Sequence, residues 1–184
     1  LILQPDTKSI SQYRFSYEDP SSLGHNSVRS LLRDHQGGMW VGTYHGGLNY
    51  YHVLAPDFRV LQHSVYRNSL SDNTVSCIAE DPFDNNLWIG TSEGLNVMDK
   101  RTGEIKKYKA PYLSNNVVSA LCVTRDNTVW VGTDNGLCRY VAEKDTFVVC
   151  GDDFGDSRLR YVTIKSLLED SDGDLWIGTW AQGL

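Results

Sequence analysis

The tetrapeptide Trp88-Ile89-Gly90-Thr91 recurs, with little change, in three other places along this chain. The other copies are Trp40-Val41-Gly42-Thr43, Trp130-Val131-Gly132-Thr133 and Trp176-Ile177-Gly178-Thr179. Each copy precedes a Gly-Leu pair, and these leucines, together with Leu1, are spaced by 47, 47, 42 and 47 residues. Internal repeats of this length are typical of β-propellers, in which each repeat folds as one small sheet, or blade. We therefore expect an all-β protein, with a β-propeller segment over 1–184.

The repeats divide the chain at approximately 1–47, 48–94, 95–136 and 137–183. Both ends of the sequence fall at the same point of the repeat. Since natural domains seldom end within a motif, we expect these four repeats to be part of a longer protein.

One repeat reads as four short strands joined by turns. The expected strands are Val75–Glu80, Leu87–Thr91, Leu95–Met98 and Glu104–Tyr108, all rich in β-branched or aromatic residues. Turn-forming Asp, Asn and Gly residues separate them. Four strands in a meander make one antiparallel propeller blade, and the fourth, outermost strand is the most polar.

The recurring tetrapeptide has a structural explanation. Side chains alternate across a strand, so Trp88 and Gly90 face one side of the blade and Ile89 and Thr91 face the other. The indole would fill the space between blades, and the glycine would let the next backbone approach closely. We therefore interpret the four motif tryptophans as structural.

The two ends of the chain are complementary. Residues 1–15 would supply the third and fourth strands of a blade, and residues 162–178 the first and second. Together they would complete one blade, closing a four-bladed ring. Otherwise, each of these two half-blades would have to be completed by the remaining blades of a larger propeller or by another copy of the chain.

The full pattern of each repeat is more specific than the tetrapeptide. It reads Asn-x-Val-x-x-(Leu/Ile)-x-(Glu/Arg)-Asp, then Gly-x-(Leu/Met)-Trp-(Ile/Val)-Gly-Thr-x-x-Gly-Leu, over 26–48 and 164–184. Residues 73–95 and 116–137 follow it with a longer and a shorter connection. This pattern resembles the two-component regulator propeller repeat.

That resemblance implies several properties. Such repeats form seven-bladed propellers, often two in tandem. They serve as the periplasmic sensor region of membrane hybrid histidine kinases of Bacteroidetes, which detect polysaccharide fragments. The resemblance therefore implies a non-enzymatic, periplasmic sensing segment whose parent protein is a sensor histidine kinase.

Composition excludes some other functions. The chain carries 17 Lys and Arg against 23 Asp and Glu, for a net charge of −6. An acidic chain without a basic stripe argues against nucleic acid as a partner. No stretch approaches the roughly 18 apolar residues of a membrane span, so we expect no membrane contact by this segment.

The four cysteines lack the spacing of a metal site. Cys77 aligns with small residues in the other repeats, which favours core packing. Cys138 and Cys150 flank one predicted hairpin, and a disulfide between them remains open.

No motif indicates a metal, a cofactor or a catalytic nucleophile. Residues Asp170 to Asp174 resemble part of a calcium loop, but the sister turns favour a plain Asp-Gly turn. All five histidines fall within residues 25–63, without a metal-binding spacing.

Loops between second and third strands, and between fourth and first strands, should emerge on a common face of the propeller. The candidate ligand-binding residues there are Tyr44, His45, Glu93, Asn135, Trp180 and Gln182, with Tyr66 and Arg67 on a longer connection. Aromatic rings beside polar groups suit an oligosaccharide ligand. Trp180 is the strongest candidate, because the framework does not require an aromatic at this position. The alternative is an ordinary loop surface.

Three functions remain open at this point. The first is a carbohydrate-sensing propeller segment of a membrane two-component signalling receptor. The second is a protein-interaction scaffold. The third is a catalytic propeller, such as a polysaccharide lyase or glycosidase, which would need convergent carboxylates or a Tyr/His pair on the central face.

Overall fold

The computed structural model describes residues 2–151, 154–155, 157–181 and 183. Over these residues the chain is built of short strands, with 3-10 turns at Ala142–Lys144 and Ser157–Arg160. The strands are β1 (Ile2–Gln4), β2 (Ser9–Ser11), β3 (Val28–Arg33), β4 (Met39–Thr43), β5 (Leu48–His52), β6 (Ala55–Leu61), β7 (Val75–Glu80), β8 (Asn86–Thr91), β9 (Gly94–Asp99), β10 (Ile105–Tyr108), β11 (Val118–Val123), β12 (Val129–Thr133), β13 (Gly136–Val141), β14 (Thr146–Val149), β15 (Ile164–Glu169) and β16 (Leu175–Thr179). The expected all-β fold is confirmed.

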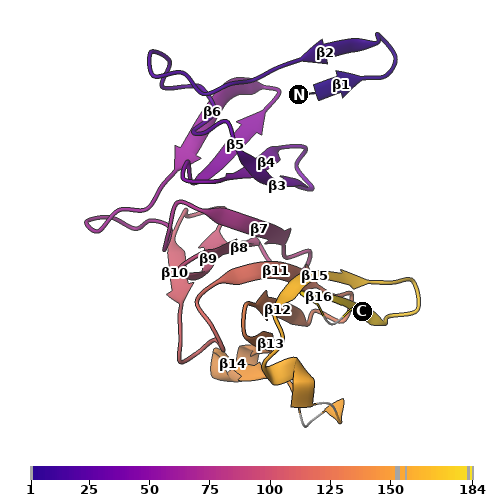
Figure 1. Ribbon diagram of the computed structural model, residues 1–184. Coiled ribbons are helices and arrows are strands. Elements are labelled where there is room, and N and C mark those ends of the chain that lie inside the picture. Colours follow the sequence, from indigo (N-terminus) through magenta and orange to yellow (C-terminus); the bar gives the residue numbers. More distant parts are fainter. Residues whose placement is uncertain (1, 152–153, 156, 182, 184) are drawn as a thin grey trace.

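These strands form three complete four-stranded sheets and two strand pairs. Strands β3–β6, β7–β10 and β11–β14 each make an antiparallel meander, and β1–β2 and β15–β16 are two-stranded. Each complete sheet is the four-stranded blade expected from the repeat. Figure 1 shows the three blades following one another in chain order.

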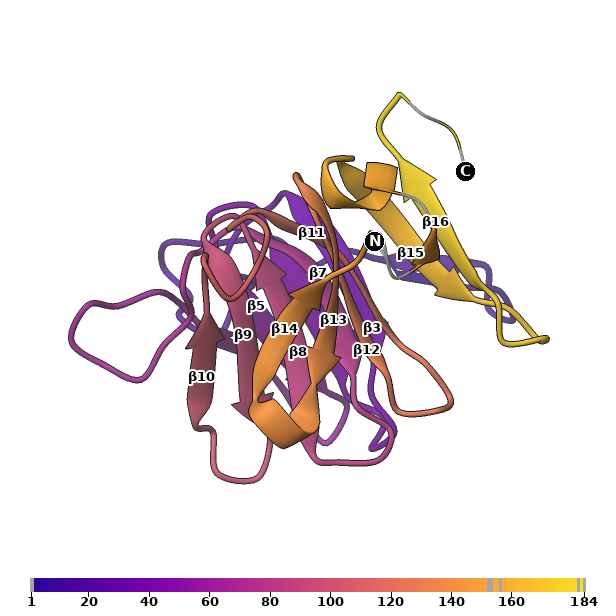
Figure 2. The same cartoon turned by 90° about the horizontal axis from the view of Figure 1, so that it is seen from below.

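The two ends of the chain do not complete each other. Strand β1 pairs with β2, and β15 pairs with β16, in two separate sheets. In Figure 1 the β1–β2 pair lies beyond β6 at one end of the molecule, and Figure 2 shows β15 and β16 beside β11. The closed four-bladed alternative is therefore wrong for this chain.

The apolar core lies between neighbouring blades. Trp88, 3% exposed, packs with Val118 and Val131 of the following blade. Ile89, from the opposite face of the same strand, packs with Trp40 of the preceding blade. A blade is too thin to bury either face alone, so each one depends on its neighbours. The alternation predicted from the tetrapeptide is confirmed.

The glycine of the motif allows this close packing. A Cβ atom built on Gly90 would lie 2.7 Å from Cγ1 and 3.2 Å from Cβ of Val118, in the following blade. Those separations are shorter than carbon–carbon contact allows. Only glycine therefore fits where β8 crosses β11.

An aspartate closes the turn between first and second strands. Asp34 Oδ1 accepts hydrogen bonds from the backbone N–H of Gln36 and Gly38, and its Oδ2 accepts the indole N–H of Trp40 at 3.0 Å. In the last repeat, Asp170 accepts the equivalent hydrogen bonds, from the indole N–H of Trp176 at 2.7 Å and from the backbone N–H groups of Asp172 and Asp174. Asp170 therefore holds a turn, as the Asp-Gly interpretation predicts.

No disulfide joins Cys138 and Cys150. The residue opposite Cys138 in the hairpin is Val149, so Cys150 is offset by one residue. An offset of one residue turns a side chain to the other face. Accordingly, Cys138 packs between the second and third blades, and Cys150 packs on the far side of the third.

Cys138 occupies a position that is Asn in the first two blades. The side-chain oxygen of Asn49 accepts a hydrogen bond from the backbone N–H of Gly24. Asn96 accepts one from the backbone N–H of Ser71 in the same way. Each side-chain amide therefore fixes the loop that leads into its blade. The Cys138 sulfur takes over this role, because Ser114 N–H lies 3.5 Å from it. These buried contacts hold the loops that form one end of the propeller.

Candidate functional site

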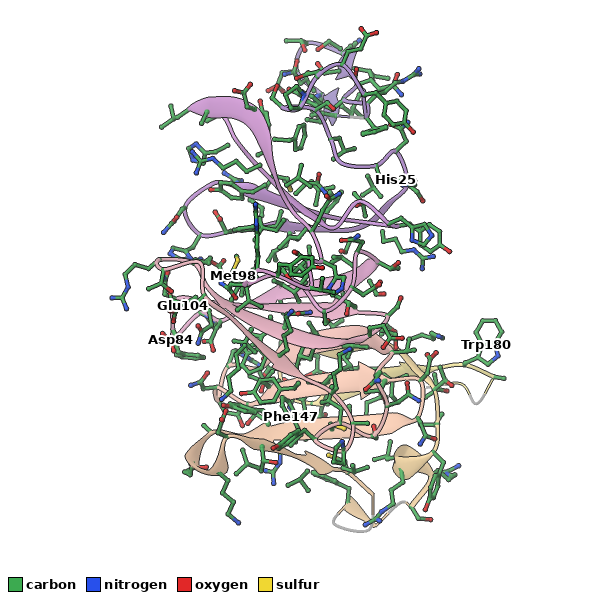
Figure 3. The ribbon with its side chains drawn as sticks, turned by 90° about the vertical axis from the view of Figure 1, so that its left-hand side faces the viewer. His25, Asp84, Met98, Glu104, Phe147 and Trp180 are labelled. Carbon is green, nitrogen blue, oxygen red and sulfur yellow. The ribbon has the colours of Figure 1, made fainter. Side chains whose placement is uncertain are left out.

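The loops predicted to share a face do so. In every repeat the residue after the motif Thr donates its backbone N–H to the segment before the first strand. The acceptors are the carbonyls of Ser27 for Tyr44, Thr74 for Ser92, Val117 for Asp134 and Thr163 for Trp180. Figure 3 shows His25 and Trp180 along one edge of the molecule, with Asp84 and Glu104 near the opposite edge. We call the edge with His25 and Trp180 the loop face.

An aromatic cluster marks the first blade at the loop face. The rings of Tyr44 and His45 lie 3.8 Å apart, and the His25 ring is 6.3 Å from that of His45. The Arg29 guanidinium carbon lies 4.7 Å from the centroid of the Tyr44 ring. The cluster offers a ring, imidazole nitrogens and a cation within one surface.

A second ring stands at the equivalent place in the last repeat. Trp180 is 69% exposed, and the Lys165 ammonium lies 6.0 Å from its ring centroid. The same ammonium is 3.1 Å from Oδ1 of Asp134 in the preceding blade. The exposed indole thus has both a cation and a carboxylate beside it.

The two rings are matched by cations at one position of the repeat. Arg29 and Lys165 each stand second in the first strand of their blades, where the two middle repeats have Ser76 and Ser119. Those middle repeats also lack the aromatic ring, since they have Ser92 and Asp134 after the motif. Cation and ring therefore occur together or not at all. Arg29 and Lys165 were not among the predicted site residues, although this covariation between repeats was visible in the sequence.

The remaining predicted residues do not join this cluster. Glu93 forms an ion pair with Lys109 of its own blade, with 3.7 Å between the charged atoms. Asn135 donates its backbone N–H to the Thr133 hydroxyl within the turn. Gln182 lies outside the described residues. The structure thus brings Tyr44 and His45 together, and it places Glu93, Asn135 and Trp180 on the same face but on other blades.

Tyr66 and Arg67 lie on the long connection between β6 and β7, and their part in a loop-face site stays a prediction. Asn68, next in the chain, donates to the Gly103 carbonyl and accepts the backbone N–H of Ile105. These partners lie at the β9–β10 turn and the start of the outermost strand of the second blade. The long connection therefore runs along the outer edge of that blade, because Asn68 anchors it there.

In the described part of the chain, no helix is both long and apolar enough to span a bilayer.

Comparison with protein families gives one match. The sequence pattern described as two component regulator propeller matches residues 22–45, 69–93, 112–135 and 158–181. Each match ends in the loop-face turn of one repeat. No curated protein matches the chain.

Solved structures with the same fold include extracellular domains of two-component systems. The extracellular domain of one hybrid two-component system from B. thetaiotaomicron is 26% identical, with a TM-score of 0.80 over 97% of this chain and 23% of that one. A second such domain from B. thetaiotaomicron is 25% identical, with a TM-score of 0.77 over 96% of this chain and 23% of that one. The chain thus spans about a quarter of the length of these relatives.

A lyase shares the fold at lower similarity. Virginiamycin B lyase from Staphylococcus aureus is 12% identical, with a TM-score of 0.63 over 82% of this chain and 48% of that one. At this identity the comparison concerns the propeller fold alone.

Proposed function

The chain belongs to the two-component regulator propeller family, and from that premise we propose that it is a carbohydrate-sensing segment of a membrane two-component receptor. In this proposal the segment binds an oligosaccharide in the periplasm and is not itself an enzyme. The parent protein is a sensor histidine kinase. The similarity of the chain to extracellular domains of hybrid two-component systems supports the sensing role.

The observation that carries the carbohydrate proposal is the repeated pairing of ring and cation on the loop face. Tyr44 with Arg29, and Trp180 with Lys165, stand at equivalent positions of two different blades. An aromatic face packs against the C–H groups of a pyranose, and the neighbouring charged side chains donate hydrogen bonds to its oxygens. Because the pairs are on separate blades, an extended oligosaccharide suits them better than a monosaccharide.

No observation favours the two alternatives to the same degree. The likeness to a lyase extends to the fold only, so it does not support a catalytic propeller. A protein-interaction scaffold would favour a broad apolar patch on the loop face, whereas the rings there stand beside charged groups.

The apolar surfaces at both ends of the described chain support a further part of the proposal. Leu31 of β3 is 65% exposed, and Leu168 and Trp176 of the last strand pair are 65% and 51% exposed. Single chains seldom leave such large neighbouring side chains in water. We propose that the remaining propeller blades, or another copy of the chain, cover these faces.

Titration of an oligosaccharide library against the intact propeller that contains this segment tests the proposal. The Trp180→Ala and Tyr44→Ala variants should each bind a confirmed ligand at least about fivefold more weakly, because a stacked ring is worth roughly 1–3 kcal/mol. Ser92→Ala changes the equivalent loop position of a blade without a ring and should leave affinity unchanged. Equal affinity for all variants would remove the loop-face rings from the site.

A further inference from the structure

A groove lies between the second and third blades, toward the end of the molecule opposite the loop face. Its volume is about 720 Å³. Trp88 and Val97 line it from one blade, and Val129 and Tyr140 from the next. Figure 3 shows two of its acidic residues, Asp84 and Glu104, on the side away from His25 and Trp180.

The groove contains a buried hydrogen-bond donor without a partner. The Trp88 side chain is 3% exposed, and its indole nitrogen makes no hydrogen bond to any described residue. The sister indoles of Trp40 and Trp176 both donate to an aspartate. A buried donor left unpaired is unfavourable, so an acceptor atom that reaches Trp88 would bind it strongly.

The reason for the missing bond is local. Asp81 precedes Trp88 by seven residues, whereas Asp34 and Asp170 precede their tryptophans by six. Asp81 uses Oδ1 to accept the backbone N–H groups of Phe83 and Asp84, which stabilise the longer turn. The extra residue thus separates the carboxylate from the indole, which it binds in the first and last repeats.

The groove is also strongly acidic. Five carboxylates and a single lysine line it. The carboxylates belong to Asp81, Asp84, Asp99, Glu104 and Asp145. The lysine, Lys106, already donates a hydrogen bond to the Asp145 carboxylate. That carboxylate also accepts hydrogen bonds from the hydroxyl groups of Tyr108 and Tyr140. The Glu104 carboxylate has neither a hydrogen bond nor an ion pair within the described residues. The remaining charge therefore favours a cation.

We propose that this groove binds an amino sugar, or a hydroxylated amine of similar size. An oxygen of the ligand accepts the indole N–H of Trp88, and its ammonium group lies among the carboxylates near Glu104. A simple amine would leave the indole unpaired, and a neutral sugar would leave the acidic groups without a counter-charge. The site is separate from the loop face and does not depend on the function proposed there.

Calorimetric titration of the full chain with glucosamine, glucose and N-acetylglucosamine tests this inference. These three probes differ in the substituent at C2, which carries a positive charge only in glucosamine. Glucosamine should bind at least about tenfold more tightly than the neutral sugars, and its affinity should fall as salt is added, since counter-ions screen the carboxylates. Equal binding of the three sugars, or no binding of glucosamine, would overturn the proposal.

Two variants and two matched controls locate the binding. Trp88→Phe keeps a ring but removes the donor, and Glu104→Gln removes one charge; each should weaken glucosamine binding about threefold to tenfold. Trp40→Phe and Glu18→Gln make the same chemical changes outside the groove and should have no effect. Weakening by Tyr44→Ala or Trp180→Ala instead would assign the binding to the loop face.

Nuclear magnetic resonance provides a readout that does not depend on variants. Glucosamine should shift the indole N–H resonance of Trp88, because the proton gains an acceptor, and should leave that of Trp40 in place. An unchanged Trp88 resonance at saturating glucosamine would contradict the proposed contact.

Discussion

Trp40 donates its indole N–H to the buried carboxylate of Asp34 at 3.0 Å, and this bond ties the second strand of a blade to the turn before it. The equivalent indole of Trp88 makes no such bond. One additional residue in the turn accounts for the difference. Two blades with the same fold therefore differ in how their motif tryptophans are held.

This difference predicts unequal effects of one substitution. Trp40→Phe should destabilise the protein by about 1–2 kcal/mol more than Trp88→Phe, because only the first removes a hydrogen bond to a charged group. Both changes remove a similar amount of apolar surface, so each is the control for the other. Urea unfolding followed by circular dichroism measures the free energies. Equal losses would show that the Asp34–Trp40 bond contributes nothing.

A methyl group at Gly90 should disturb the packing between blades. Gly90→Ala places its Cβ against Val118 of the next blade, and overpacking of this kind costs about 1–3 kcal/mol. Gly178→Ala is the matched control, since the short contact there is with the Ser166 hydroxyl, which can rotate away. Thermal unfolding of both variants compares the sites. A stable Gly90→Ala protein would mean that the blades can move apart without loss.

Replacement of a motif tryptophan by alanine should destabilise the protein more when its indole ring is more deeply buried. Trp88→Ala should cost about 3–5 kcal/mol, the range for a buried large aromatic. The side chain of Trp176, on the final strand pair, is 51% exposed. Trp176→Ala should therefore destabilise the isolated chain by roughly half as much. Denaturant titration of the two variants measures the ratio. A full-sized loss at Trp176 would indicate that another sheet covers it.

Acid should weaken one contact between the first two blades. Burial alone would raise the pKa of Glu80, but hydrogen bonds from Lys100 and from His35 of the preceding blade lower it overall. A carboxyl group whose pKa is lower in the folded than in the unfolded state stabilises the protein at pH values above the unfolded pKa, which is about 4.3 for Glu. This contribution is lost as the pH falls through the lower, folded value.

The Glu80→Gln variant isolates this effect. Its free energy of unfolding should fall less steeply than that of the wild type when the pH is lowered below about 4.3. Glu18→Gln, on the exposed N-terminal segment, is the control and should keep the wild-type slope. Parallel slopes for Glu80→Gln and wild type would contradict a role for Glu80 in the acid response.

Local pattern made several structural features predictable. The fourfold tetrapeptide predicted the blades, and strand alternation assigned Trp88 and Ile89 to opposite faces, because side-chain direction in a strand depends on sequence parity alone. The common position of Tyr44 and Trp180 followed from the repeat in the same way. The location of each of these residues follows from its position within one repeat, which the local sequence shows.

Other features depended on the register between strands and on contacts between distant segments. Cys138 faces Val149 rather than Cys150, and Asn68 holds its loop against the outer edge of the second blade. The acidic groove exists only because two blades pack side by side, with Trp88 on one and Tyr140 on the other. The sequence by itself therefore determined the blades and the loop face, since these repeat locally. The tertiary structure alone decided the thiol positions and the groove, because a shift of one residue in register or in turn length changes which side chains meet.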